Sequence, residues 1–600
     1  MGGAIAALIL ADGGEPAGGA SASEILWGSI GALLIFSALG LLGVLHRSGR
    51  TKTLTNLGAF SERVTGLPAW CALPVAVAGG ALVMAAFGFY WDVATHIDDG
   101  RDPGPFANPS HYFIIFGLLG IATAGYLGVL LGTPATLRTS LRIKEGWHAP
   151  VGAILLIVCG GIAVMGFPLD DVWHRLFGQD VTLWGPTHIQ MVGGAALSTL
   201  ALWVLFSEGR RGATEPQRPI WRALELTIAG AFLVGVSALQ AEFDYSVPQF
   251  RMLFHPVLLA LSAGLALVPA RIRLGRGGAL IAVAFFLGLR GLLSLIIGPG
   301  FGHTTLHFPL YLAEALLVEL VALRVSTDRQ VTFGVWSGLA IGTVGVAAEW
   351  VWSRIGMPFG WSDPLLPEIW VATVAGVAGG VVGGLIGRAL GDLTAPKQSL
   401  PRFAAAFATL GVVFALVYPL PISADVQGRA TVTLDNPEAA STTATIEFDP
   451  PHLAAEPLWL NVTSWQGGGS RIAPLEPVGG GVYRSSAFPI SGSWKSLIRL
   501  HTGSSIVAVP LYLPEDPAIP AEEVPATARF TRDFVQDKKI LLREAKDTPA
   551  WMSWVGYSLL GLIVVIWISI LAWGAARMDK NGSVGRGGPR FLRRVLHPVG

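Results

Sequence analysis

Long apolar segments recur along almost the whole of this 600-residue chain, and they limit its fold more than any other feature. A helix needs about 20 apolar residues to cross a hydrocarbon core about 30 Å thick. Segments of this length predict a polytopic α-helical membrane protein with about 13 transmembrane helices. The predicted helices cover residues 25–46, 69–91, 110–132, 149–168, 185–206, 220–240, 251–270, 278–298, 305–323, 331–353, 368–388, 402–420 and 551–576.

The composition agrees with a membrane location, because 52% of the residues are hydrophobic and only 14% are charged. The formal net charge is +1, whereas nucleic-acid binding needs concentrated positive charge, so no nucleic-acid partner is expected. Cys71 and Cys159 are the only cysteines, and both lie in apolar stretches. A disulfide framework and a thiolate metal cluster are therefore excluded. The preference for Arg over Lys, with abundant Ala and Gly, is typical of a high-GC bacterium.

Basic residues divide the connections between the apolar segments into two alternating sets. Arg and Lys gather in every second connection, as in residues 46–63 and 138–144, and again in the tail from residue 577. Because positive residues are retained on the cytoplasmic side, these connections and the C-terminus are predicted to be cytoplasmic. The segment from 421 to 550 is then extracytoplasmic. We expect a multi-pass protein of a bacterial plasma membrane.

The segment between the last two apolar runs changes character, with short strand-like stretches separated by Gly, Pro and Asn. It predicts an extracytoplasmic immunoglobulin-like β-sandwich, followed by a charged and largely helical connection. Residues 481–495 are similar to immunoglobulin-like domains of bacterial copper-handling membrane proteins. His452 and His501 are its only histidines, which favours a structural or docking role over a metal site. The predicted organisation is an external segment at 1–24, membrane helices at 25–206 and 207–420, the β-sandwich at 421–512, the charged linker at 513–550, the last membrane helix at 551–576 and a basic tail at 577–600.

Acidic residues and histidines recur in two matching patterns at the extracytoplasmic ends of predicted helices. Each pattern reads Asp-x3-His-x3-Gly-x-Asp, followed by Pro-[Ser/Thr]-His at the start of the next helix. Asp and His four residues apart share a helix face, and the next helix returns the second His to the same depth. This repetition favours two metal sites over a chance set of interfacial polar residues. The predicted ligands are Asp92, His96 and His111 in the first copy, and Asp170, His174 and His188 in the second.

Two imidazoles and one carboxylate suit Cu(II), Zn or Fe(II), and they disfavour Ca and Mg, which prefer oxygen ligands alone. Asp102 and Asp180 complete the two patterns. We expect each to orient a ligand imidazole from outside the coordination sphere.

The first hairpin resembles one in the C subunit of the particulate methane and ammonia monooxygenases, the copper membrane monooxygenase family. In that family one such hairpin supplies a copper site with Asp, His and His, and a second supplies a copper site with Asn, His and His. The resemblance covers about residues 70–205 and implies copper at both sites, with Asp170 where the family has Asn. It also implies a catalytic role for the second set, Asp170, His174 and His188.

The rest of the chain departs from that family. Those enzymes consist of three separate subunits, whereas this chain continues through further helices and carries its own β-domain. The expected partners are membrane lipid, together with additional membrane subunits or an electron donor.

Other polar residues lie outside the repeat. Glu242 and His255 flank the connection between the sixth and seventh segments, either as a degenerate third copy or as part of a solvated loop. His303 and His307 have a spacing at which one helix can present both to a metal, although a ligand role is the less favoured interpretation.

Charged residues also occur deep within the predicted helices. A buried Arg needs a carboxylate partner, so Arg290 is expected to pair with Glu314 or Glu349. Glu319 is expected to pair with Arg324.

These features favour a copper-dependent membrane oxidoreductase that uses O2 on a small apolar or lipid-like substrate. The alternative is a copper acquisition or delivery protein on the outer face. A third hypothesis, a transporter or structural protein without metal, leaves the repeat unexplained.

Overall fold

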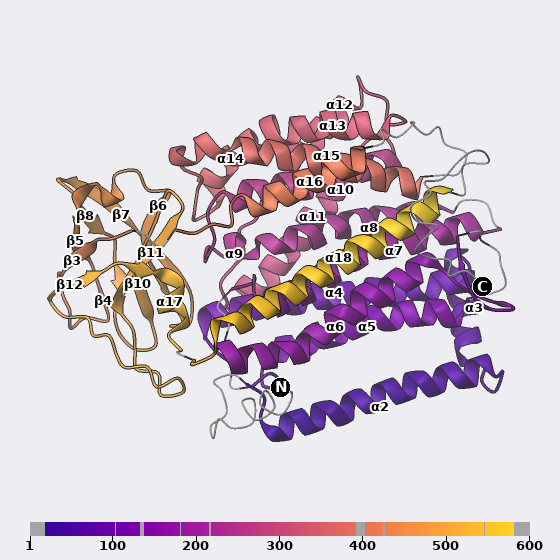
Figure 1. Ribbon diagram of the computed structural model, residues 1–600, viewed down its shortest axis with the longest axis horizontal. Helices are drawn as coiled ribbons and strands as arrows, with labels where there is room; N and C mark the ends of the chain where they lie inside the picture. Colours follow the sequence, from indigo (N-terminus) through magenta and orange to yellow (C-terminus); the bar gives the residue numbers. More distant parts are fainter. Residues whose placement is uncertain are drawn as a thin grey trace.

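The computed structural model describes residues 19–580, except for residues 103, 133–136, 138, 180–181, 215–217, 392–402, 424–425 and 545. A bundle of helices carries a separate β-sheet domain at one end (Figure 1). Within the described ranges, eleven helices are long and apolar enough to cross a membrane. The chain is therefore a multi-pass membrane protein.

The eleven spans coincide with eleven of the predicted segments. The remaining two segments contain shorter helices, α12 (Leu312–Val321) and α16 (Ala404–Val417), so a count of thirteen spans stays a prediction. The spans are α2 (Ala22–Arg47), α4 (Ala69–Asp98), α5 (Pro109–Leu130), α6 (Val151–Phe177), α7 (Pro186–Gly212), α8 (Pro219–Ser237) with η1 (Ala238–Gln240) and α9 (Ala241–Asp244), α10 (Phe254–Leu274), α11 (Gly278–Leu295) with η2 (Ile296–Gly300), α13 (Gln330–Ala340) with η3 (Ile341–Gly345) and α14 (Val346–Gly356), α15 (Trp370–Leu390), and α18 (Ala550–Lys580).

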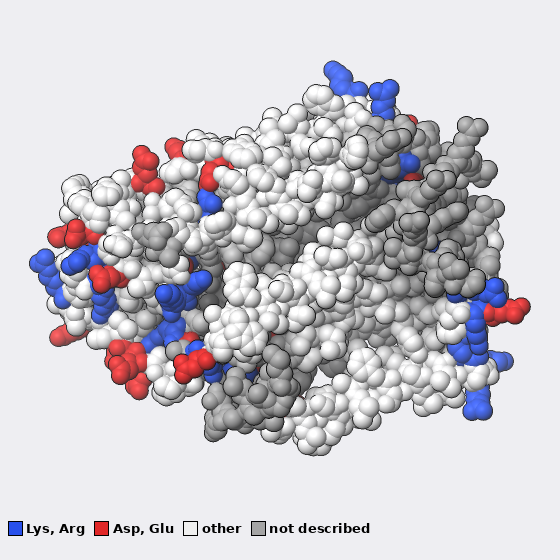
Figure 2. Space-filling view, viewed as in Figure 1, with Lys and Arg blue, Asp and Glu red and all other residues white. Residues whose placement is uncertain are grey.

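Short elements occupy several connections. Helix α3 (Thr53–Thr65) and the hairpin of β1 (Leu141–Lys144) and β2 (Trp147–Ala149) lie at the end of the bundle away from the β-domain, and η4 (Asp363–Glu368) precedes α15. Figure 2 shows a face without charged side chains over much of the bundle, with Lys and Arg at the end opposite the β-domain and charged side chains of both signs on the β-domain. This distribution is what a segment immersed in lipid requires.

Glycine lets the helices of each predicted hairpin approach closely. A Cβ at Gly117 of α5 would lie 2.6 Å from the backbone nitrogen of Ala85 in α4. A Cβ at Gly194 of α7 would lie 2.7 Å from the carbonyl oxygen of Cys159 in α6. In lipid no hydrophobic driving force brings helices together, so close van der Waals packing between small residues holds them instead. The two hairpins, α4 with α5 and α6 with α7, are therefore tightly packed units.

The β-domain is built on a nine-stranded antiparallel sheet of order β12-β3-β5-β8-β7-β6-β10-β11-β13. Its edge strands β12 and β13 are separated in sequence by Phe534 alone, so the sheet must curl until its edges approach each other. The strands are β3 (Arg429–Leu434), β5 (Ala444–Asp449), β6 (Trp459–Trp465), β7 (Arg471–Gly479), β8 (Val482–Ser485), β10 (Lys495–Thr502), β11 (Ser505–Tyr512), β12 (Arg529–Asp533) and β13 (Val535–Gln536), with a small separate sheet of β4 (Ser441–Thr442) and β9 (Phe488–Pro489).

The connection after residue 512 differs from the largely helical linker that we expected. It contributes β12 and β13 to the sheet, and its only described helix is α17 (Asp537–Leu542). In β12, Phe530 lies opposite Val432 of β3 and packs on the domain core. Charge along this segment suggested a solvated helix, but alternate residues of β12 face the core, which favours strand pairing.

The β-domain rests on the end of α4. The backbone N–H groups of Gln466 and Gly468 donate to the carbonyl oxygens of Ile97 and Asp98, each at 3.0 Å. Arg499 of β10 donates to the carbonyl oxygen of Pro248 at 2.5 Å. These contacts hold the domain over the helix ends that carry the predicted metal ligands.

Two buried charges in the bundle, Arg290 and Glu319, have partners other than those we expected. Arg290 of α11 is fully buried and pairs with Asp244 of α9, not with Glu314 or Glu349. It also donates to the hydroxyl of Tyr90 and lies over that ring. The short helix α9 turns the chain inward and brings Asp244 to Arg290, a path that the apolar pattern does not show.

Glu319 also has a different partner. It pairs with Arg271 at 2.7 Å, rather than with Arg324. Its carboxylate accepts from the backbone N–H groups of Gly277 and Ala279, both at 3.0 Å, at the start of α11. A negative charge is favourable at this helix N-terminus.

Arg290→Leu leaves the carboxylate of Asp244 buried without its cation, so we expect the free energy of unfolding to fall by about 3–5 kcal/mol. Denaturant titration of detergent-solubilised protein measures this loss. The double variant Arg290→Leu/Asp244→Leu removes both charges and is expected to recover most of it. The control Arg484→Leu breaks an exposed pair with Asp435 and is expected to cost less than about 1 kcal/mol. A loss at Arg290 no larger than that of the control would contradict the prediction.

Candidate metal centres

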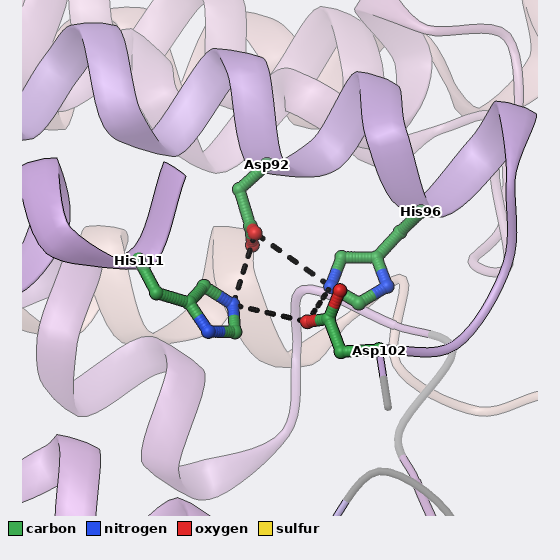
Figure 3. Close-up of side chains that lie close together, drawn as sticks. All are labelled: Asp92, His96, Asp102 and His111. Carbon is green, nitrogen blue, oxygen red and sulfur yellow. Dashed lines mark ion pairs between the residues drawn. The ribbon is translucent and has the colours of Figure 1, made fainter. Parts of the chain in front are cut away.

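Four side chains converge where α4 and α5 meet the β-domain (Figure 3). Asp92 and His96 come from α4, Asp102 from the connection, and His111 from the first turn of α5. The Nε2 atom of His111 lies 3.0 Å from Asp92 Oδ1 and 3.3 Å from Asp102 Oδ2. The Nε2 atom of His96 lies 3.6 Å and 3.2 Å from the same two oxygens. One ligand atom from each residue lies within 4.8 Å of the others, a spacing at which a single metal ion can be held.

The imidazoles of this first group are oriented by backbone carbonyls. His96 Nδ1 lies 3.0 Å from the carbonyl oxygen of Gly100, and His111 Nδ1 lies 2.7 Å from that of Pro105. A carbonyl oxygen only accepts, so each Nδ1 donates, and Nε2 is the nitrogen that faces the two carboxylates. Nε2 is therefore the nitrogen that would bind a metal.

The glycine of the repeated pattern has a local role. Gly100 and Gly178 follow the ends of α4 and α6, with φ angles of +95° and +83°. Glycine adopts this left-handed region without the steric cost that a Cβ imposes. The turn at Gly100 points its carbonyl oxygen at His96.

The Pro-[Ser/Thr]-His motif positions the carboxylate as well as the histidine. Pro109 opens α5, where its missing N–H costs nothing, and Asn108 caps the helix by accepting from the N–H of Ser110. The hydroxyl of Ser110 donates to Asp92 Oδ1 at 2.7 Å, and Asn108 donates to the same oxygen at 2.9 Å. Sequence analysis did not assign these roles to Asn108 and Ser110, although an Asn before Pro at a helix start is a capping pattern.

The second group repeats this arrangement at α6 and α7. The Nε2 atoms of His188 and His174 lie 3.4 Å and 3.7 Å from the two oxygens of Asp170. Thr187 donates to Asp170 Oδ1 at 2.5 Å, and His188 Nδ1 lies 2.8 Å from the carbonyl oxygen of Thr182. The Nε2 atom of His174 is buried and makes no hydrogen bond within the described residues. Asp170, His174 and His188 each offer one ligand atom within 4.8 Å of the others.

Asp102 and Asp180 were both expected to lie outside the coordination spheres. Asp102 lies about as close to both imidazoles as Asp92 does, so it is a candidate fourth ligand. Asp180 lies outside the described residues.

Both groups line one cavity of about 1020 Å³. Its walls include residues of α2 and the membrane-facing edge of the β-domain, where Lys495 and Arg499 project from β10. Burial lowers the pKa of Lys495 to about 8. The cavity therefore joins the two groups beneath the β-domain.

Glu242 lines this cavity but belongs to neither metal group. It accepts from the hydroxyl of Thr182 at 2.5 Å and from the N–H groups of Leu183 and Gln249. Thr182 supplies the carbonyl that orients His188, so Glu242 is a positioning residue for the second group. His255, the other member of the suggested third copy, accepts from Trp361 Nε1 at 3.0 Å and stacks on Phe243. These contacts make His255 a structural residue.

His303 and His307 are not brought together, because the described residues around them form no helix. His303 Nδ1 lies 3.2 Å from Asp98 Oδ2, and His307 Nδ1 lies 3.2 Å from the carbonyl oxygen of Gly356. Burial lowers the pKa of His307. Neither residue belongs to the metal groups found among the described residues.

The histidines of the β-domain also stand apart from the groups. His501 is fully buried against Trp459, and burial holds its pKa well below the usual range, aided by Arg251 and Arg499. His452 is exposed. Neither histidine belongs to a metal group among the described residues.

Comparison with known proteins gives no relative: no family model, no curated protein and no solved structure matches the chain significantly. The geometry of the two groups is therefore the basis for inferring a function.

Thr187→Val removes the hydroxyl that holds Asp170 while keeping the side-chain volume. We expect the second group to bind divalent metal about 10–100-fold more weakly, because loss of such outer partners lets the ligand reorient. Competition with a chelator measures the change. Ser198→Ala is the control, since its hydroxyl donates to Gly194 on the same helix and touches no ligand. Equal affinities in both variants would show that Thr187 does not position Asp170.

Proposed function

We propose that this chain is a membrane metalloprotein with a copper centre in each His/Asp group, and that it acts as an oxidoreductase resembling the copper membrane monooxygenases. The observation that carries the proposal is the duplicated geometry: in both groups, imidazole Nε2 atoms and a hydroxyl-held carboxylate converge on one point beside a shared cavity. Two chance clusters would not repeat the same helix-start hydroxyl and backbone-oriented imidazole.

The donor set supports copper. The first group offers two nitrogens and two carboxylate oxygens, and the second offers two nitrogens and one carboxylate. Among divalent first-row metals, such sites bind Cu(II) most tightly. Zinc and iron are the alternatives. The residues that hold the ions are Asp92, His96, Asp102 and His111 in the first group, and Asp170, His174 and His188 in the second.

The second group is the proposed catalytic centre. Copper, when bound, supplies the one-electron chemistry that reaction with O2 requires. Three described ligands leave room beside Asp170, His174 and His188 on the cavity side. Thr187 and Glu242 keep the ligands in place. An apolar or lipid-like substrate would approach from the cavity.

We further propose that both centres and the β-domain lie on the extracytoplasmic side of a bacterial plasma membrane. The gathering of Lys and Arg at the other end of the bundle supports this orientation (Figure 2). The curled antiparallel sheet is compatible with an immunoglobulin-like sandwich. Additional membrane subunits or an electron donor are the proposed partners.

A second candidate function is copper acquisition or delivery. The β-domain supports it, because Trp465 and Lys495 border the cavity that holds both groups, and a metallochaperone could dock there. Soft Met or Cys ligands, which favour Cu(I), occur in neither group.

Elemental analysis of detergent-purified protein tests the metal sites. We expect about two copper ions per chain, one for each group. His96→Ala and His174→Ala are each expected to lose about one ion, and the double variant both. His452→Ala, an exposed histidine outside the groups, is the control. Unchanged metal content in the double variant would overturn the proposal.

Oxygen consumption distinguishes an oxidoreductase from a copper acquisition or delivery protein. With a reductant and a hydrocarbon substrate, the wild type is expected to consume O2, and His188→Ala at least about 100-fold more slowly, because its ligand set is incomplete. Copper that exchanges rapidly with a chelator, without O2 consumption, would favour acquisition or delivery instead.

A further inference from the structure

We propose that the cavity beside the metal groups binds the hydrocarbon chain of a long-chain substrate drawn from the membrane. The chain would lie in an arm of the cavity between α4, α7, α8 and α11. This inference rests on the proposed function, because it names the class of substrate that the catalytic group would act on.

The arm is long and runs parallel to the helices. On α4 the lining extends from Asp92 to Val75, which is 17 residues or about 25 Å along the axis. On α7 it extends from His188 to Leu202, which is 14 residues or about 21 Å. A hydrocarbon core is about 30 Å thick, so the arm reaches through roughly two-thirds of it. This length suits an extended acyl or alkyl chain.

The walls of the arm offer almost no polar group. They are formed by side chains such as Val75 and Leu82 of α4, Leu202 of α7 and Ile228 of α8. The hydroxyls of Thr199 and Thr227 are occupied, because each donates to a carbonyl of its own helix, Ala196 at 2.5 Å and Ala223 at 3.0 Å. Water needs polar partners to occupy a cavity, whereas hydrocarbon does not. The arm is therefore better suited to a hydrocarbon chain than to water.

The volume of the cavity also favours a long-chain ligand. A volume of about 1020 Å³ is at the upper end of ligand sites, which are about 300–1,000 Å³, and is far more than a gas molecule fills. Polar groups are concentrated at one end, where the carboxylates and imidazoles lie. An elongated molecule would thus place one end among the metal ligands and the rest of its chain in the arm.

Two adjacent glycines allow a matched test. A Cβ built on Gly79 or on Gly80 meets no atom within 4 Å. Gly79 lines the cavity, whereas Gly80 does not line it and is exposed on the membrane-spanning surface of α4. Gly79→Leu therefore narrows the arm at that position, and Gly80→Leu adds the same side chain on the lipid side.

The probe is a long alkyl alcohol with a photoreactive diazirine at its tail, applied to full-length protein in lipid nanodiscs. Labelled peptides are mapped by mass spectrometry. We expect wild type and Gly80→Leu to be labelled on α7 and α8, and Gly79→Leu at least about tenfold less, because the methylenes of the chain lose their burial. A short alkyl probe is expected to label all three proteins equally.

Equal labelling of Gly79→Leu and Gly80→Leu by the long probe would overturn the inference. Labelling that requires prior removal of lipid would also overturn it, because it would identify a permanently bound structural lipid. Metal content is measured on the same samples. If the protein binds copper and Gly79→Leu does not reduce labelling, this inference is wrong and the proposed function stands. If Gly79→Leu reduces labelling but the wild type holds no metal, the site for the chain is supported and the proposed function is wrong.

Discussion

The cost of holding charge away from water controls this structure. An ion buried among apolar helices is stable only when a partner of opposite charge or several hydrogen bonds compensate for its lost hydration. Glu225 of α8 meets the requirement with Arg210 at 2.6 Å and Arg273 at 2.8 Å, and Arg290 meets it with Asp244. These pairs join different helices of the bundle.

The two His/Asp groups meet this requirement differently. Their carboxylates accept from hydroxyls, but their imidazole Nε2 atoms converge on the same carboxylates, and His174 Nε2 makes no hydrogen bond among the described residues. A metal ion would complete the groups in the way that an opposite charge completes the ion pairs. The recurrence of the same arrangement in two hairpins is what supports the metal sites.

The helical hairpin is the unit that builds each group. Its close glycine contacts fix the two helices side by side, its terminal glycine turns the chain, and its Pro-[Ser/Thr]-His start returns a hydroxyl and an imidazole to the aspartate. The β-domain then rests on the first hairpin through backbone contacts to Ile97 and Asp98. Rigid hairpins beneath a separate cover enclose one cavity between the two groups.

Local sequence patterns were enough to predict the membrane class, eleven of the spans and the two repeated sets of residues, because hydropathy and i, i+4 spacing are local properties of the chain. Which distant groups meet became visible in the folded chain alone. In the structure Asp102 lies at ligand distance and Arg290 pairs with Asp244. His303 and His307 lie apart, and residues 529–536 join the sheet. These outcomes depend on turns in the connections and on packing between elements. Such contacts lower the total desolvation cost of the buried polar groups, and this total depends on residues that are far apart in the sequence.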